Sequence, residues 1–235
     1  MTYRALHSYI LIFFFLSLAA TVFGWAQLRS VRASWMNVPP VPSAEGALAY
    51  GLGDPFLAYR IIGLNLQNLG DTGGRITPLR DYDYKKLAGW FDVEYALDSR
   101  SNFIPYLAAY YFSAVDKPEK ADLMVDYLVK AGQAQGEGKW RFLAQAVYIS
   151  RYIVKDLGKA YQIALDLNAQ TDPAIAPWVR QLPAFVLMQQ GDKEGAERFM
   201  LQFLSDAAGK LSVQEVNAIK DYVCHGNPQE GFCSN

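Results

Sequence analysis

The chain has few of the residues from which most enzyme active sites are built. Its 235 residues include only two histidines and two cysteines. His7 lies in an apolar segment and His225 directly follows Cys224, so the central part of the chain cannot form a histidine-dependent triad or a histidine-rich metal site. The zinc motif HExxH, the nucleophile motif G-x-S-x-G, the phosphate-binding loop and the dinucleotide motif are also absent. We therefore expect no catalytic residues, no metal site and no cofactor.

The chain also lacks an excess of charge of either sign. Lys and Arg total 22 and Asp and Glu total 23. Nucleic-acid binding usually needs a basic surface, so nucleic acid is not an expected partner. Arg4, Arg29 and Arg32 are the only charged residues before Glu45. A mildly acidic body therefore follows a basic N-terminal segment.

Charge is missing altogether from Tyr9 to Ala26. As a helix this apolar run would span about 27 Å, close to the roughly 30 Å of a bilayer's hydrocarbon core. We therefore predict a membrane anchor over residues 1–36 with a single transmembrane helix. The alternative is a cleaved signal peptide, because Gly24 and Ala26 place small residues where a peptidase reads them. The run is longer than a usual signal core of about 7–15 residues, which favours the uncleaved anchor.

Charge alone does not orient this anchor, because Arg4 on one side is matched by Arg29 and Arg32 on the other. The two cysteines, Cys224 and Cys233, enclose a segment rich in turn-forming residues. We predict that they form a disulfide, which would place the body in an oxidising compartment outside the cytoplasm. Two reduced thiols are the alternative. A metal site with His225 fits no common zinc spacing.

The rest of the chain is predicted to be all-α. A Pro-rich stretch within residues 37–53 indicates a spacer. Beyond it, no segment shows the alternation of a strand, and acidic or hydroxyl residues stand where helices would begin. These predicted N-caps are Asp54, Asp83, Asp116, Asp156, Asp192 and Ser212. The predicted divisions are a leading helical segment over 54–100, repeats over 101–211, and a C-terminal helix with the cysteine loop over 212–235.

A small residue recurs just after three of these helix starts. Ala121, Ala160 and Ala196 lie 39 and 36 residues apart. Two antiparallel helices can approach closely where one of them presents only a methyl group, so this spacing indicates repeated helical hairpins. A single hairpin cannot bury both of its faces, and neighbouring hairpins are therefore expected to stack.

This pattern resembles the tetratricopeptide-repeat family, whose period is 34 residues. The resemblance covers about residues 101–204. It also extends more weakly to the leading segment of membrane-anchored, tetratricopeptide-like bacterial proteins, through the sequence Leu97-Asp98-Ser99-Arg100. In the middle repeat, Tyr148 stands where a small residue is expected and Arg151 where an apolar one is. The last repeat matches best, at Ala184, Leu187, Gly191, Ala196, Met200 and Phe203, and the first matches at Ala109, Phe112, Ala121, Val125 and Leu128.

The resemblance implies a right-handed superhelical stack of hairpins whose concave groove, lined by the first helix of each pair, binds protein segments. The alternative is that the aromatic side chains at these positions fill the core. Tyr and Gln suit a binding surface because they combine contact area or hydrogen-bonding reach with little charge. The residues that would line the groove are Tyr106, Tyr110, Gln145, Tyr152, Gln181 and Phe185.

The sequence therefore favours a non-catalytic adaptor that binds protein partners in an envelope membrane complex. The resemblance implies a bacterial inner-membrane location with the body in the periplasm. Two alternatives stay open. One is an accessory subunit held mainly by its transmembrane helix. The other is a carboxylate-dependent enzyme acting on glycans, which would need two acidic side chains facing one cleft.

Overall fold

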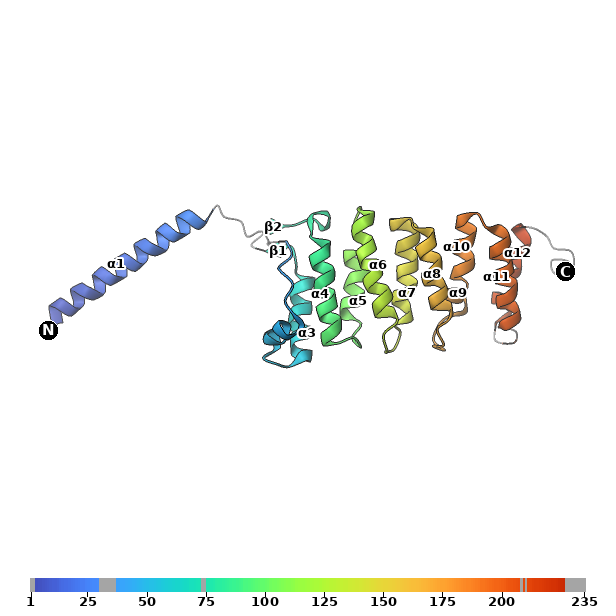
Figure 1. Ribbon diagram of the computed structural model, residues 1–235, viewed down its shortest axis with the longest axis horizontal. Coiled ribbons are helices and arrows are strands. Elements are labelled where there is room, and N and C mark those ends of the chain that lie inside the picture. The colour runs from blue at the N-terminus through green and yellow to red at the C-terminus, as the bar shows by residue number, and fades with distance from the viewer. Residues whose placement is uncertain (1–2, 30–36, 73–74, 208, 210, 227–235) are drawn as a thin grey trace.

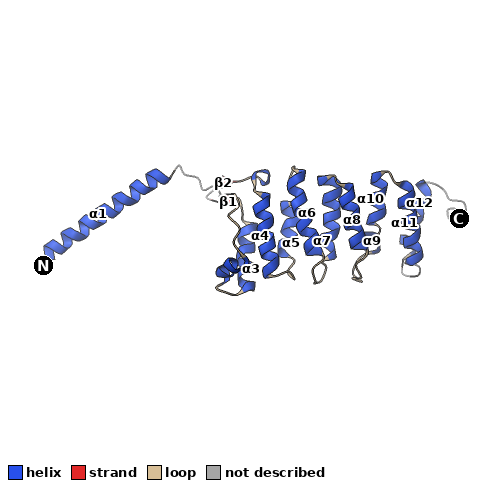
Figure 2. Cartoon of the chain, viewed as in Figure 1, coloured by secondary structure: helices blue, strands red, loops and turns tan. Residues whose placement is uncertain are grey.

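The fold is all-helical apart from one pair of two-residue strands. The structure, a computed structural model, describes residues 3–29, 37–72, 75–207, 209 and 211–226. After the N-terminal helix α1 (Tyr3–Leu28), the helices of the body stand side by side in the order of the sequence (Figure 1). Strands β1 (Asp71–Thr72) and β2 (Arg75–Ile76) pair antiparallel at the N-terminal end of this row. Helix accounts for nearly all of the remaining regular structure (Figure 2).

Helix α1 contains a segment long and apolar enough to cross a membrane. This segment runs from Tyr9 to Leu28, and its side chains contact nothing in the body that buries them. Its hydroxyl groups bond to the helix backbone: Ser17 Oγ donates to Phe14 O at 2.9 Å, and Thr21 Oγ1 donates to Ser17 O at 2.8 Å. Such bonds satisfy polar side chains where no water is present. The sequence-based expectation of an apolar N-terminal helix is therefore confirmed.

The Pro-rich stretch is not a free spacer, which corrects the prediction for residues 37–53. Val38 is fully buried, Asn37 Nδ2 donates to Asp81 O at 2.7 Å, and Trp90 Nε1 donates to Pro39 O at 3.0 Å. Val41 packs against Gly89, where an added Cβ would meet its Cγ2 at 2.9 Å. The stretch thus belongs to the body. It continues into α2 (Ala44–Leu48) and the 3₁₀ turn η1 (Ala49–Gly51).

The leading segment pairs α3 (Pro55–Gln67) with α4 (Tyr84–Leu97). Between them lie the two strands and the 3₁₀ turn η2 (Leu79–Asp81). Tyr59, Ile62 and Leu66 of α3 are buried, as the apolar spacing predicts. Phe56, one turn before Tyr59 on the same helix, is 60% exposed.

Three hairpins and a last helix follow. The first helices of the hairpins are α5 (Phe103–Tyr106) with its π-helical continuation η3 (Leu107–Phe112), α7 (Trp140–Ile149) with the π-helical η4 (Ser150–Val154), and α10 (Leu182–Gln190), which the short α9 (Pro177–Arg180) precedes. The second helices are α6 (Pro118–Gly132), α8 (Leu157–Asn168) and α11 (Lys193–Asp206). The last is α12 (Val213–Gly226).

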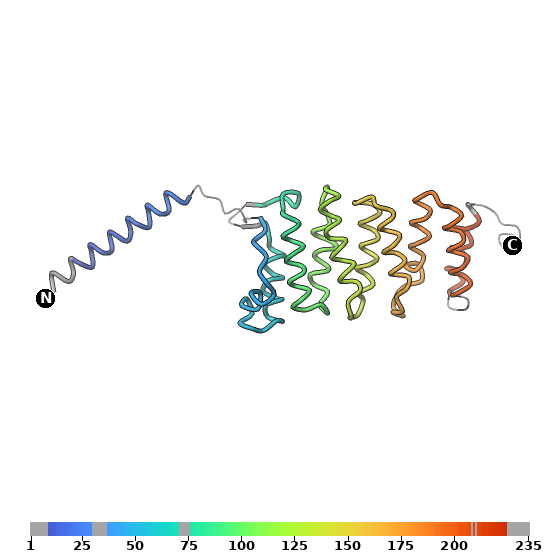
Figure 3. Tube along the Cα trace, viewed as in Figure 1, coloured from blue at the N-terminus to red at the C-terminus, as the bar shows by residue number. Residues whose placement is uncertain are grey.

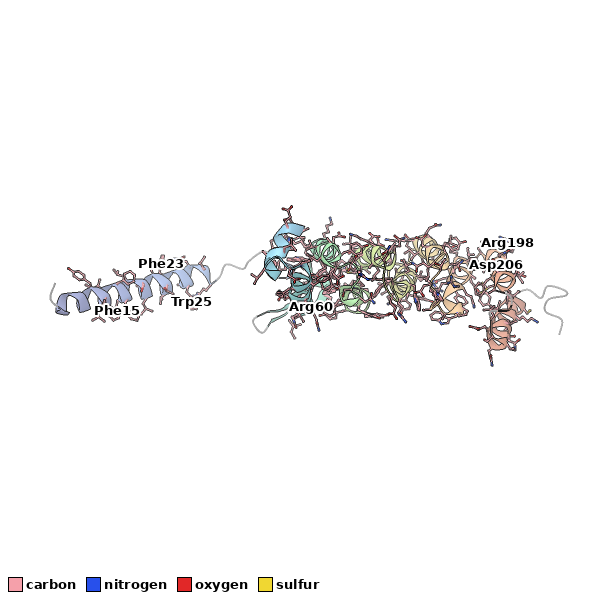
Figure 4. The ribbon with its side chains drawn as sticks, turned by 90° about the horizontal axis from the view of Figure 1, so that it is seen from below. Phe15, Phe23, Trp25, Arg60, Arg198 and Asp206 are labelled. Atoms are coloured by element: carbon pink, nitrogen blue, oxygen red, sulfur yellow. The ribbon has the colours of Figure 1, made fainter. Side chains whose placement is uncertain are left out.

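Consecutive helices of this part run antiparallel, as the chain trace shows (Figure 3). Seen along the helix axes they form two rows, with the first helices in one row and the second helices in the other (Figure 4). Ala121, Ala160 and Ala196 are each 0% exposed, which confirms that they lie at helix contacts. Helix α6 packs against α7, and α8 packs against both α7 and α10, so each hairpin is also in contact with the next.

Most of the predicted helix starts are confirmed. The side chains of Asp54, Asp83, Asp156 and Asp192 accept backbone N–H bonds in the first turns of their helices. Ser212 and Glu215 form a reciprocal capping box. The prediction for Asp116 is wrong. Lys117 takes the N-cap position, with Pro118 as the first helical residue and no side-chain cap.

The structure describes one of the two cysteines. Cys224 lies in α12, but Cys233 lies outside the described residues. The disulfide, and the orientation of the body that was argued from it, therefore stay predictions.

Candidate protein-binding surface

Exposed tyrosines on the first hairpin begin a surface that continues along the row of first helices. Tyr106 and Tyr110 are 42% and 59% exposed. They lie one helical turn apart and stack with ring centroids at 5.8 Å. Tyr106 is also held edge-on against the buried ring of Phe142 at 5.2 Å, which ties the pair to the second hairpin. These two side chains therefore keep a fixed position although half of their area faces solvent.

Next to Tyr110 lies a hollow of about 320 Å³ between the first and second hairpins and α9. Gln145 lies in its wall and reaches Ala109 O at 3.5 Å, and Trp178 stands beside it with 58% of its area exposed. The residues that line this hollow are Tyr110, Trp140, Arg141, Ala144, Gln145, Val147, Tyr148, Arg151, Trp178 and Leu182.

A second hollow, of about 520 Å³, opens between η4, α10 and α12. Tyr152 of η4 and Phe185 of α10 both line it, and the ring of Phe185 packs edge-on against Tyr222 at 5.6 Å. Partial burial of the Tyr222 side chain raises the pKa of its phenol above the ordinary value. The lining residues are Arg151, Tyr152, Phe185, Met188, Gln189 and Tyr222.

Arg151 joins the two hollows because it lines both of them. Its Nε donates to Gln189 Oε1 at 2.9 Å, and its guanidinium lies over the ring of Tyr152 at 4.9 Å. These contacts hold the guanidinium in one place without neutralising it. No carboxylate of the described residues forms an ion pair with Arg151.

We call this surface the aromatic face and define it by Tyr106, Tyr110, Gln145, Tyr148, Arg151, Tyr152, Trp178, Phe185 and Tyr222. Its charge differs from that of the body. Arg141 and Arg151 line the hollows, whereas no Asp or Glu does, although acidic residues outnumber basic ones in the chain. The aromatic face therefore combines exposed rings with positive charge.

Five of the six predicted groove residues lie on the aromatic face. The sixth, Gln181, is only 7% exposed where α9 meets α10, so it offers almost no surface to a partner and that assignment is wrong. Tyr148 and Arg151 depart from the repeat pattern, which expects a small residue and an apolar residue at these positions. Ala146 and Ser150, both 0% exposed, occupy the packed face of this helix, and Tyr148 is 51% exposed. Trp178 and Tyr222 gave no signal in the sequence.

The two π-helical segments lie at this surface. Tyr110 belongs to η3, and Arg151 and Tyr152 belong to η4. A π turn holds one more residue than an α turn, so it rotates the side chains that precede it relative to those that follow. In the first helices of the first two hairpins, buried small residues such as Ala109 and Ser150 therefore stand next to exposed rings such as Tyr110 and Tyr152. Short π segments are frequent at functional sites.

No protein-family model matches the chain, and neither a curated protein nor a solved structure matches it.

A larger hollow of about 700 Å³ lies near the second helices α8 and α11 and the segment between α8 and α9. Its polar groups already have partners within the body. Arg180 donates to the carbonyl oxygens of Asn168 and Gln170 at 3.0 and 2.8 Å, and Gln202 bonds to Asp206 at 2.8 Å. These side chains are therefore engaged within the body, whereas the guanidinium of Arg151 on the aromatic face has no carboxylate partner among the described residues.

Glu94 of α4 is the one buried Asp or Glu among the residues that the structure describes. Neither of its carboxylate oxygens has a hydrogen-bond partner in that part of the chain. Burial, with a smaller contribution from the charge of Asp98, raises the pKa of Glu94 to about 8. Glu94 lines neither hollow of the aromatic face, and no second buried carboxylate faces it.

Proposed function

We propose that this protein is a non-catalytic, membrane-tethered scaffold that binds protein partners along its aromatic face. The observation that carries the proposal is the series of aromatic side chains on four consecutive units of the row, joined through Arg151. Tyr106, Tyr110, Tyr148, Tyr152 and Trp178 are exposed, and Phe185 and Tyr222 are partly exposed. Exposed aromatic and Arg side chains are typical of protein-binding surfaces and rare elsewhere on a soluble surface.

The proposal includes the architecture. Hairpins stacked in two rows, with a buried alanine at the same place in each second helix, support a tetratricopeptide-like superhelix with the aromatic face on its inner side. It also includes the anchor: α1 would remain uncleaved in a bacterial inner membrane, with the body in the periplasm. The length and composition of Tyr9–Leu28 support the span, and the predicted disulfide supports the orientation.

The chemistry of the face favours one kind of partner. Two guanidinium groups and no carboxylate line hollows whose other walls are mostly aromatic or aliphatic. A polypeptide segment that carries apolar side chains and at least one carboxylate complements this surface, since Arg pairs with carboxylates in two parallel hydrogen bonds. We therefore propose an acidic, partly apolar segment of another envelope protein as the ligand.

The test is affinity isolation of the full-length protein from membranes, followed by identification of the bound subunits by mass spectrometry. We expect Tyr110→Ala together with Tyr152→Ala to remove the partner. Tyr111→Ala is the matched control, because Tyr111 is the adjacent tyrosine of η3, is 44% exposed, and lines neither hollow. Equal recovery of the partner by both variants would reject the aromatic face as the binding surface.

The same isolation separates the scaffold from an accessory subunit held by its transmembrane helix. Replacement of the first 34 residues by an unrelated anchor should leave the partner bound if the aromatic face makes the contact. Loss of the partner after this exchange would instead favour the anchor as the contact. A glycan-cleaving enzyme has less support, because Glu94 has no second buried carboxylate facing it among the described residues.

A further inference from the structure

Large apolar side chains are exposed at the N-terminal end of the body. Between residues 37 and 100, every exposed large apolar side chain precedes α4. Leu52 is 93% exposed and Ile76 is 87% exposed, which is nearly complete exposure. The full set is Val41, Tyr50, Leu52, Phe56, Leu57, Leu64 and Ile76. The end helix of a stack normally presents a polar outer side, so this end of the row has the composition of a covered surface.

Helix α3 carries the centre of this surface. Leu57 and Leu64 lie seven residues apart and therefore point nearly the same way, opposite to the buried Tyr59 and Leu66. Arg60, which lies between them in the sequence, is also exposed, and Figure 4 labels it at the N-terminal part of the body. The exposed side of α3 thus presents Leu57 and Leu64 together with the cation of Arg60.

Leu52 ends η1 in a left-handed backbone conformation that the helix cap stabilises, with Leu52 N–H donating to Ala49 O at 3.3 Å and Gly53 N–H donating to Leu48 O at 2.9 Å. Its φ is +53° and its ψ is +33°, the left-handed region that Gly or Asn adopts at lower cost. Its side chain is almost wholly exposed. The cap accounts for the backbone of this turn, whereas no described part of the body covers the apolar side chain of Leu52.

The attachment to α1 limits what that contact can be. Asn37, Val38 and Pro39 are fixed to η2 and α4 by the contacts described above. Only residues 29–36 connect this point to Leu28, the end of the apolar segment. Eight residues reach at most about 30 Å when fully extended. If α1 spans a bilayer, the N-terminal end of the body is therefore held within about 30 Å of that bilayer, close enough to contact it.

We infer that the apolar end surface, defined by Leu52, Phe56, Leu57, Arg60 and Leu64, lies on the lipid bilayer. Its apolar side chains would enter the boundary between headgroups and acyl chains, and Arg60 would extend its guanidinium to lipid phosphates. The inference rests on α1 remaining as the membrane anchor. It adds a second membrane contact, which directs the row of helices away from the bilayer and leaves the aromatic face accessible.

The test uses the full chain in nanodiscs of phosphatidylcholine and phosphatidylglycerol, with a spin label on Leu52→Cys or Leu64→Cys. Collision of the label with oxygen, which concentrates in lipid, is compared with collision with a water-soluble nickel chelate. Val213→Cys is the matched control, since Val213 is a 73% exposed aliphatic residue at the other end of the body. The unsubstituted protein, treated with the same label, shows how much of the signal comes from Cys224 and Cys233.

We expect labels at positions 52 and 64 to have an oxygen-to-nickel collision ratio several-fold above that at position 213. Nickel accessibility equal to that at position 213 would overturn the inference. A label shielded from both reagents would also overturn it, since protein rather than lipid would then cover the surface. Phe15→Cys, within α1, separates the two proposals. A nickel-accessible label there would reject the anchor itself, whereas an oxygen-accessible label there with exposed positions 52 and 64 would reject only the lipid contact.

Discussion

Ala196 is the residue that most directly tests the packing of the last hairpin. It is 0% exposed within a cluster that includes Ala184, Met200 and Ile219. Leucine at this position would add three carbon atoms where α11 approaches α10, so we expect Ala196→Leu to lower the free energy of unfolding by about 1–3 kcal/mol. Thermal or urea unfolding followed by circular dichroism measures the change.

Ser205→Leu is the control for this substitution, because it introduces the same side chain at an exposed position of the same helix. We expect it to leave stability nearly unchanged. If Ala196→Leu and Ser205→Leu unfold at the same temperature, the hairpin contact at Ala196 is not as described.

Glu94 makes stability depend on pH in a direction opposite to that of most acidic residues. Burial raises the pKa of its carboxyl from an ordinary value near 4.5 to about 8 in the folded chain. The stability that Glu94 contributes in its protonated form is fully present below about pH 4.5 and is lost as the pH rises towards about 8. In this range the unfolded chain has an ionised Glu94, so folding must take up a proton or bury a charge. We expect Glu94→Gln to be more stable than the unsubstituted protein near pH 8 and similar to it near pH 4.

Urea unfolding midpoints of both proteins across this pH range measure the effect. A constant difference between them at every pH would show that Glu94 does not titrate with a raised pKa.

At the scale of elements, the helix caps distinguish two aspartates that look alike in the sequence. Asp54 Oδ1 accepts from the backbone N–H of Phe56 at 2.8 Å and of Leu57 at 3.0 Å. Asp116 caps no helix, because Lys117 precedes Pro118 at the start of α6. We expect Asp54→Ala to cost about 0.5–2 kcal/mol of unfolding free energy and Asp116→Ala to cost almost nothing. Comparable losses in the two variants, measured by chemical unfolding, would contradict these cap assignments.

The caps also show what the sequence could predict. Asp156 and Asp192 were recognised because a cap depends on residues within one turn of each other. The docking of Pro39 and Val41 onto α4 was not predicted, since it depends on Trp90 and Gly89 about 50 positions away. A Pro-rich stretch has the same composition when it is free and when it is bound. The outward position of Tyr148 and Arg151 was missed because π segments shift the helical register, which a repeat of fixed period does not show.

At the scale of the whole molecule, the predicted bond between Cys224 and Cys233 bears on the orientation of the body. A disulfide that closes a loop of this length contributes about 2–3 kcal/mol in the chain-entropy model, and it persists only in an oxidising compartment. We expect intact, non-reduced protein to take up no thiol-alkylating reagent and reduced protein to take up two equivalents, measured by mass. Two labelled cysteines on freshly isolated, non-reduced protein would remove both the bond and the argument for a body outside the cytoplasm.

The central claim is that the aromatic face holds a protein partner, and site-specific photo-crosslinking in native membranes tests it most directly. A photoreactive phenylalanine analogue would replace Tyr106 or Trp178, which flank the hollows, and Val213 would serve as the distant exposed control. The account predicts a discrete protein adduct from positions 106 and 178 that is absent from position 213 and is lost when Arg151→Glu reverses the charge between the hollows. Adducts of equal yield from all three positions, or none from positions 106 and 178, would contradict it.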